Sequence, residues 1–74
     1  MKKKMIVAGY EITLKEMYSP NNSILFGVHP NGSQFATWDY NPWAGAFWGH
    51  YFFSEEEAKA DYHKRLAEEY EQLK

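Results

Sequence analysis

Apolar and polar residues alternate along the first part of the chain. Between residues 5 and 17, the apolar side chains of one parity are Ile6, Ala8, Tyr10, Ile12 and Leu14. Because successive side chains of a strand point to opposite faces, this period of two predicts a β-strand with one buried face. Further runs rich in aliphatic and aromatic residues predict three more strands, at 23–29, 34–40 and 47–53.

Turn signals separate the predicted strands. Ser19-Pro20-Asn21-Asn22 combines proline, which fixes φ, with asparagine, which tolerates left-handed conformations. Asn31-Gly32 is a pair favoured by a two-residue type I′ hairpin, because both positions of that turn need a positive φ. A looser loop is expected at 41–46, before the fourth strand. The strands are therefore expected to follow one another as an antiparallel meander.

The predicted turns also give an expected register. The two-residue hairpin places Phe26 opposite Thr37. The looser loop then places Tyr40 opposite Phe47, and Thr37 opposite His50. Side chains that are directly opposite each other share a face of the sheet, so these pairs decide which residues lie together.

A capping box begins a helix after the fourth strand. Ser54 is suited to accept the backbone N–H of Glu57, and three glutamates stand in the positively polarised first turn. The helix is predicted over 55–73, with an apolar stripe formed by Ala58, Tyr62, Leu66, Tyr70 and Leu73. We therefore expect a single domain, residues 1–74, of the α+β class: a four-stranded antiparallel β-meander followed by one C-terminal amphipathic helix packed on one face.

The expected register divides the side chains between two faces. One face is apolar along the first strand, and Gly27, Ala36 and Gly49 leave a shallow trough in which a helix can approach closely. We assign this face to the helix. The opposite face is then uncovered, and it carries the predicted interaction residues Phe26, Phe35, Asp39, Trp48, His50 and Phe52. The alternative is that this second face curls on itself or is closed by the N-terminal arm.

Composition supports an interaction surface. Phe, Trp and Tyr make up 19% of the 74 residues, which is more than a small core needs. The formal net charge of −2 gives no general attraction to polyanions. The chain has no cysteine, which is typical of a reducing cytoplasm, and no run approaches the roughly 18 apolar residues of a membrane span. We therefore expect a cytoplasmic protein that does not contact a membrane.

Catalytic chemistry has little support in the sequence. Thr37, Asp39 and His50 are expected to be neighbours, but a general base also needs a positioned substrate and a tuned pKa. The simpler interpretation is a cross-strand polar pair. His29, His50 and His63 lack the spacing of metal ligands. No catalytic residue, metal site or cofactor is predicted, and we do not expect an enzyme.

Three binding functions remain as hypotheses. The first is a non-enzymatic interaction protein whose aromatic face binds a protein partner or a second copy as a homodimer, because Trp and Tyr dominate binding hot spots. The second is a nucleic-acid-binding accessory domain of a mobile element, which is disfavoured because Lys15 is the one basic side chain on that face. The third is small-ligand or carbohydrate binding on Trp43 or Trp48, with the polar partners Asp39, Asn41 and His50.

A resemblance rests on three segments in the C-terminal half. They are Thr37-Trp38-Asp39-Tyr40, the run Phe47-Trp48-Gly49-His50-Tyr51-Phe52, and the acidic helix that begins at Ser54. Together they resemble small uncharacterised proteins of bacterial mobile elements. The expected architecture is also similar to the small DNA-binding domains of some phage and transposon integrases. The first resemblance implies an accessory role in bacteria or their phages, with no activity or functional residue attached.

Overall fold

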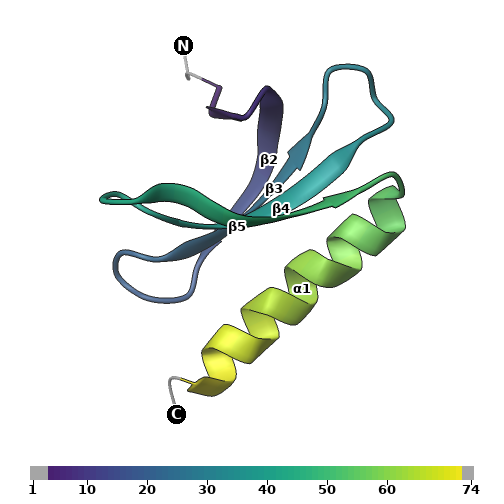
Figure 1. Ribbon diagram of the computed structural model, residues 1–74. Helices are drawn as coiled ribbons and strands as arrows, with labels where there is room; N and C mark the ends of the chain where they lie inside the picture. The colour runs from purple at the N-terminus through teal and green to yellow at the C-terminus, as the bar shows by residue number, and fades with distance from the viewer. Residues whose placement is uncertain (1–3, 73–74) are drawn as a thin grey trace.

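The computed structural model describes residues 4–72, which form an antiparallel sheet followed by one helix (Figure 1). The sheet order is β1-β2-β3-β4-β5, so each strand pairs with its neighbour in the chain. This arrangement confirms the α+β class and the meander, but the described residues contain five strands, where four were predicted. The elements are β1 (Ile6–Val7), β2 (Tyr10–Met17), β3 (Ser23–Val28), β4 (Phe35–Asn41), β5 (Gly45–Phe52) and α1 (Glu55–Gln72).

The additional strand arises because the predicted first strand folds back on itself. Ala8 and Gly9 both have positive φ, 51° and 86°, and they connect β1 to β2 as a tight two-residue turn. Val7 therefore faces Tyr10. The apolar alternation continues through this turn, which is why the period alone predicted one uninterrupted strand.

The β3–β4 hairpin has the predicted register and a different turn. Phe26 pairs with Thr37, as expected. Gly32 has a φ of 76°, and its N–H donates to the carbonyl oxygen of His29 at 2.9 Å. Asn31 does not have a positive φ, so the turn is not type I′. Because the longer turn is still symmetric about the same midpoint, the strand pairing is unchanged.

The β4–β5 hairpin is tighter than predicted. Asn41 pairs with Gly45, and the Asn41 side chain accepts the N–H groups of Trp43 and Ala44 at 3.0 and 2.7 Å. The connection therefore comprises residues 42–44, where a loop over 41–46 was predicted.

A bulge changes the register along β4 and β5. Thr37 pairs with His50, as expected, but Phe47 pairs with Asp39 and not with Tyr40. The register shifts between these two pairs, where Trp48 has a positive φ of 54°. Such an additional residue on one strand is a β-bulge, which alternation of apolar and polar residues does not reveal.

The helix covers the face opposite to the one we predicted. A core cluster joins α1 to β3 through Ile24, Phe26, Ala58, Tyr62 and Leu66, all buried, and packs against the partly buried Tyr18, Val28, Phe35 and Phe52. The predicted open face therefore lies beneath α1, and the prediction was wrong on this point. Ser54 caps the helix as expected, with the Glu57 N–H 3.3 Å from its hydroxyl oxygen. Leu73, the last residue of the predicted stripe, lies outside the described residues.

A second, smaller core occupies the other face of the sheet. Its buried members are Tyr10, Leu25, Ala36 and Trp38, and residues near the N-terminus, including Met5 and Val7, pack against it. A second register shift, between Ile12 and Leu14, moves Leu14 opposite Phe26 and therefore away from this core. The predicted trough on this face is filled by the Trp38 ring, which is buried between Gly27 and Gly49.

The close packing of the Trp38 ring against Gly49 yields a prediction about stability. A Cβ atom at Gly49 would lie 2.7 Å from Nε1 and 2.9 Å from Cδ1 of Trp38. We expect Gly49→Ala to lower the free energy of unfolding by about 1–3 kcal/mol, because the buried indole must move. Urea denaturation measures the change. The loss should shrink in a Trp38→Phe background, and an equal loss in both backgrounds would contradict the steric explanation.

Candidate functional site

A buried ion pair links α1 to the sheet. The guanidinium of Arg65 donates to the Asp39 carboxylate at 3.2 Å and to the Thr37 hydroxyl at 3.0 Å. All three residues are buried. A buried guanidinium without such acceptors would be strongly unfavourable, so the polar residues of β4 compensate Arg65.

Polar contacts extend from this ion pair in both directions. The Thr37 hydroxyl donates to Asp61 Oδ2 at 2.6 Å, and His50 Nδ1 lies 3.0 Å from the same oxygen. On the other side, the Tyr18 hydroxyl donates to Asp39 at 2.8 Å. Every buried side-chain nitrogen and oxygen of the described residues has a hydrogen-bond partner. We call Tyr18, Thr37, Asp39, His50, Asp61 and Arg65 the polar network.

The polar network has the geometry of a structural link. Thr37, Asp39 and His50 are brought close together, as the sequence predicted, but Thr37 and Asp39 are buried beneath α1 and only His50 is partly exposed. The Thr37 hydroxyl has no exposed surface, and its proton points to Asp61 and not to His50. A nucleophile needs access to substrate and a base that accepts its proton. The Asp61 carboxylate could accept the proton of Thr37, but the buried hydroxyl has no access to substrate.

The six predicted interaction residues are therefore not a common surface. Phe26 and Asp39 are 1% and 4% exposed, and Phe35 and Phe52 are partly buried against the helix cluster. The His50 side chain is about half exposed and bonds to Asp61. Trp48 alone among the six projects well into solvent, with 73% of its surface exposed.

A different group of aromatic residues is exposed along β5 and its two ends. These residues are Trp43, Trp48, Tyr51 and Phe53, with exposures from 58% to 82%, and we call them the aromatic edge. Sequence reasoning assigned Tyr51 and Phe53 to the helix-covered face and named Trp43 only as a platform for sugars. The sequence did contain a signal for this surface, because residues 40–54 include no Asp, Glu, Lys or Arg.

β5 itself is the outermost strand of the sheet on its side. It pairs with β4 and with no other strand of the described residues. Figure 1 shows α1 running beneath the sheet, where its buried residues pack on the face that carries Ile24 and Phe26. The aromatic edge therefore combines exposed rings with a strand edge that retains unpaired backbone groups.

Trp48 has a strained backbone. Its φ of 54° lies in the left-handed region, where an L-residue other than glycine is disfavoured by about 1–2 kcal/mol. The indole makes an edge contact with Phe47, with ring centroids 5.0 Å apart, but stays mostly in solvent. The isolated fold therefore gains little from a tryptophan at a position that glycine would occupy without strain.

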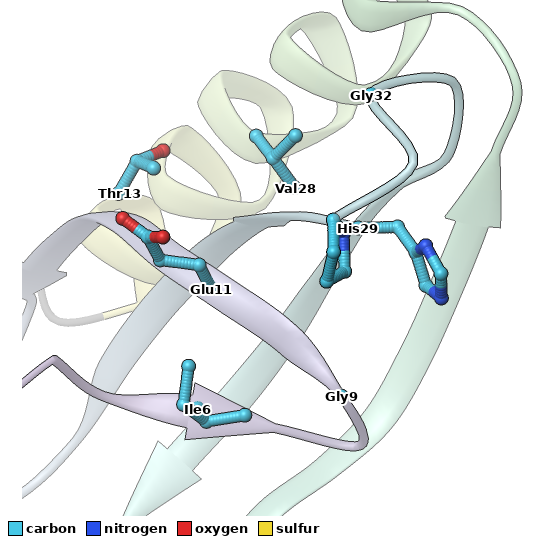
Figure 2. Close-up of a pocket in the computed structure, with 8 residues that line it drawn as sticks. Ile6, Gly9, Glu11, Thr13, Val28, His29 and Gly32 are labelled. Carbon is cyan, nitrogen blue, oxygen red and sulfur yellow. The ribbon is translucent and has the colours of Figure 1, made fainter.

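A pocket of about 400 Å³ lies between the β1–β2 and β3–β4 turns (Figure 2). Figure 2 shows Glu11 and Thr13 together on one side and the His29 ring pointing away from them. The Nζ atom of Lys4 lies 3.5 Å from Oε1 of Glu11 and partly neutralises the carboxylate. His29 Nδ1 accepts the N–H of Asn31 at 3.1 Å. Since the pocket offers one compensated charge, it is a poorer candidate than the aromatic edge.

Residues 4–72 contain neither a metal-binding cluster nor a helix suited to span a membrane. No group of three or more His, Asp or Glu side chains in this part of the chain is placed to hold a metal ion. No helix in it combines the length and the apolar character of a membrane span.

Comparison with protein-family models, curated proteins and solved structures finds no match for the chain. The resemblance to proteins of bacterial mobile elements therefore stays a prediction.

The buried ion pair yields a second prediction. Arg65→Met leaves Asp39 buried without its cation, and we expect the free energy of unfolding to fall by about 3–5 kcal/mol. Lys64→Met, at the neighbouring exposed position, should change it by less than about 0.5 kcal/mol. Circular dichroism during urea denaturation compares the two variants. Similar losses in both would contradict a stabilising role for the Arg65 contacts.

A third prediction concerns alkaline pH. Burial, followed by the hydrogen bond to Asp39, raises the pKa of Tyr18 well above its ordinary value. Above about pH 10 the unfolded chain releases this proton while the folded chain keeps it, so the contribution of Tyr18 to stability is constant below that pH and falls as pH rises.

Tyr18→Phe tests this dependence. The variant should lose about 1 kcal/mol at pH 8, because the hydrogen bond to Asp39 is gone. Between about pH 9 and 11, its unfolding free energy should fall less steeply than that of the wild type. Urea denaturation at each pH gives both curves. Parallel curves would show that Tyr18 ionisation does not contribute.

Proposed function

We propose that the protein is a non-enzymatic binding protein that associates through the aromatic edge, with a second copy or with another protein. The observation that carries the proposal is Trp48, which is both highly exposed and held at a positive φ. The proposal includes a cytoplasmic location, which the lack of cysteine supports. It also includes an accessory role in bacteria or their phages, for which the resemblance of the C-terminal half is the support.

The energetics of Trp48 favour binding over a structural role. Strained backbone positions concentrate at functional sites, where another interaction compensates their cost. In the free protein the Trp48 indole gains little, because most of it faces water. Burial of such a ring by a partner would recover a substantial hydrophobic contribution, and Trp and Tyr are enriched in binding hot spots for this reason.

The chemistry of the surface favours a protein partner over the two alternative ligands. The uncharged segment 40–54 has no cation for nucleic-acid phosphates. A carbohydrate site would need polar groups beside the rings, but Asp39 is buried with Arg65, and the Asn41 side chain accepts two N–H groups of its own hairpin. An apolar, uncharged edge is suited to another apolar surface.

Photo-crosslinking in an extract of the native cell tests the proposal. A benzophenone side chain at Phe53, which is 82% exposed, should form adducts because it lies in the proposed contact. The same group at Met17, an exposed apolar residue on β2, is the matched control and should form none. Equal adducts at both positions, or none at either, would reject the aromatic edge as a binding surface.

Substitutions of Trp48 separate binding from stability. Trp48→Gly removes the ring and relieves the positive φ, so its unfolding free energy should stay within about 1 kcal/mol of the wild type. Trp48→Ala removes the ring and keeps the strain, so it should be the less stable of the two. Both should abolish the Phe53 adduct. Retention of the adduct in both folded variants would contradict a role for the indole.

A further inference from the structure

We infer that the partner is a second copy of this chain, and that β5 strands from two copies pair antiparallel to join their sheets into one. The inference rests on the proposed function, because it names the occupant of the aromatic edge. It follows from the backbone of β5, the distribution of charge, the register of the side chains and the exposed area.

The backbone of β5 specifies a strand as its occupant. β5 has eight residues and pairs on one side only, with β4. The outer side of such a strand presents N–H and C=O groups that another extended chain satisfies. A second β5 is a strand of equal length that is always present at the same concentration.

The edge also lacks the usual protection against such pairing. Exposed edges are commonly blocked by charged residues, by proline, or by being very short. The opposite edge consists of the two-residue β1 and of β2 beyond Ile12, where Lys15 and Glu16 supply blocking charges. β5 has neither charge nor proline, and its one interruption is the bulge at Trp48. The stretch from Gly49 to Phe52 is therefore the continuous part of the edge.

The faces of β5 determine the register of the pair. A twofold axis perpendicular to the sheet places both helices on one face, so opposite residues must belong to the same face. Tyr51 is opposite Ala36 on the face away from α1, and His50 is opposite Thr37 on the helix face. A pair centred on Tyr51 meets this requirement. It places Tyr51 against Tyr51 of the second copy and Phe52 against His50 of the second copy, with Phe53, just after the strand, near Gly49 of the second copy.

Area and charge are consistent with a reversible dimer. An aromatic side chain buries about 150–250 Å², so the exposed fractions of Trp48, Tyr51 and Phe53 offer about 400 Å² per copy. Two copies would then bury about 800 Å² of ring surface, which corresponds to a weak, reversible interface. Since residues 40–54 have no formal charge, two identical edges meet without repulsion.

A single cysteine tests both the partner and the register, because the chain has none of its own. In purified protein, Tyr51→Cys should form an intermolecular disulfide under mild oxidation, since directly opposite Cα atoms lie about 4.5–5.5 Å apart. Met17→Cys, at an exposed position on β2, should stay monomeric on a non-reducing gel. Equal crosslinking of both variants, or of neither, would overturn the proposed register.

Sedimentation of the wild type tests association without a substitution. The weight-average mass should rise from monomer to dimer between about 1 µM and 1 mM. Trp48→Gly should sediment as a monomer over the same range. Amide exchange in β5 should slow with concentration in the wild type, while exchange in β2 should not change.

The outcomes separate this inference from the function on which it rests. A purified wild type that stays monomeric at 1 mM, while benzophenone at Phe53 captures a different protein from the extract, overturns self-association and leaves the binding surface intact. A monomer that also forms no adduct overturns both. A dimer whose β5 amides exchange at an unchanged rate overturns the strand pairing.

Discussion

The guanidinium of Arg65 lies between α1 and the sheet, where it bonds to Asp39 and Thr37. Both faces of this sheet are apolar enough to pack against a helix, so burial of hydrophobic surface does not by itself determine which face the helix covers. A buried cation does, because it needs an anion and further acceptors within reach. Only the face that carries Asp39 and Thr37 supplies them. The orientation of the helix, and therefore the identity of the free surfaces, depends on this contact.

Once α1 occupies that face, the other side of the sheet has to close without a helix. It does so around Trp38, whose ring fits against Gly27 and Gly49 and makes edge contacts with Tyr10 and Tyr51. The N-terminal hairpin adds apolar contacts at one end of this second core. The aromatic residues beyond Trp38, toward the end of β5, have no further cover. The aromatic edge is thus exposed because α1 covers one face of the sheet and the N-terminal hairpin covers only one end of the other face.

Local signals predicted local structure well. The Asn-Gly turn gave the pairing of Phe26 with Thr37, and Ser54 with Glu57 gave the start of the helix, because each depends on a few adjacent residues. The features missed were the Ala8-Gly9 turn and the two bulges, which interrupt the period of two without breaking the apolar pattern. Each bulge moves the following side chains to the other face. The prediction of the site was wrong because Asp39 and His50 were assigned to an open face. In the structure, Arg65 of the helix bonds to Asp39, and Asp61 of the helix bonds to His50.

The same sheet limits how far association through β5 can proceed. Within the described residues, the sheet has two edges: β5 on one side, and β1 with the part of β2 beyond Ile12 on the other. The second edge carries Lys15 and Glu16, and charged side chains oppose the addition of a strand. In the proposed dimer, pairing about a twofold axis uses the β5 edge of both copies and leaves only these charged edges, so the assembly closes at two copies. The Trp48 bulge shortens the stretch that can pair and increases the local twist, which opposes the flat stacking of a fibril. In the proposed dimer, the bulge therefore has two effects: its positive φ presents the Trp48 indole to the second copy, and it restricts the edge of β5 to a short contact.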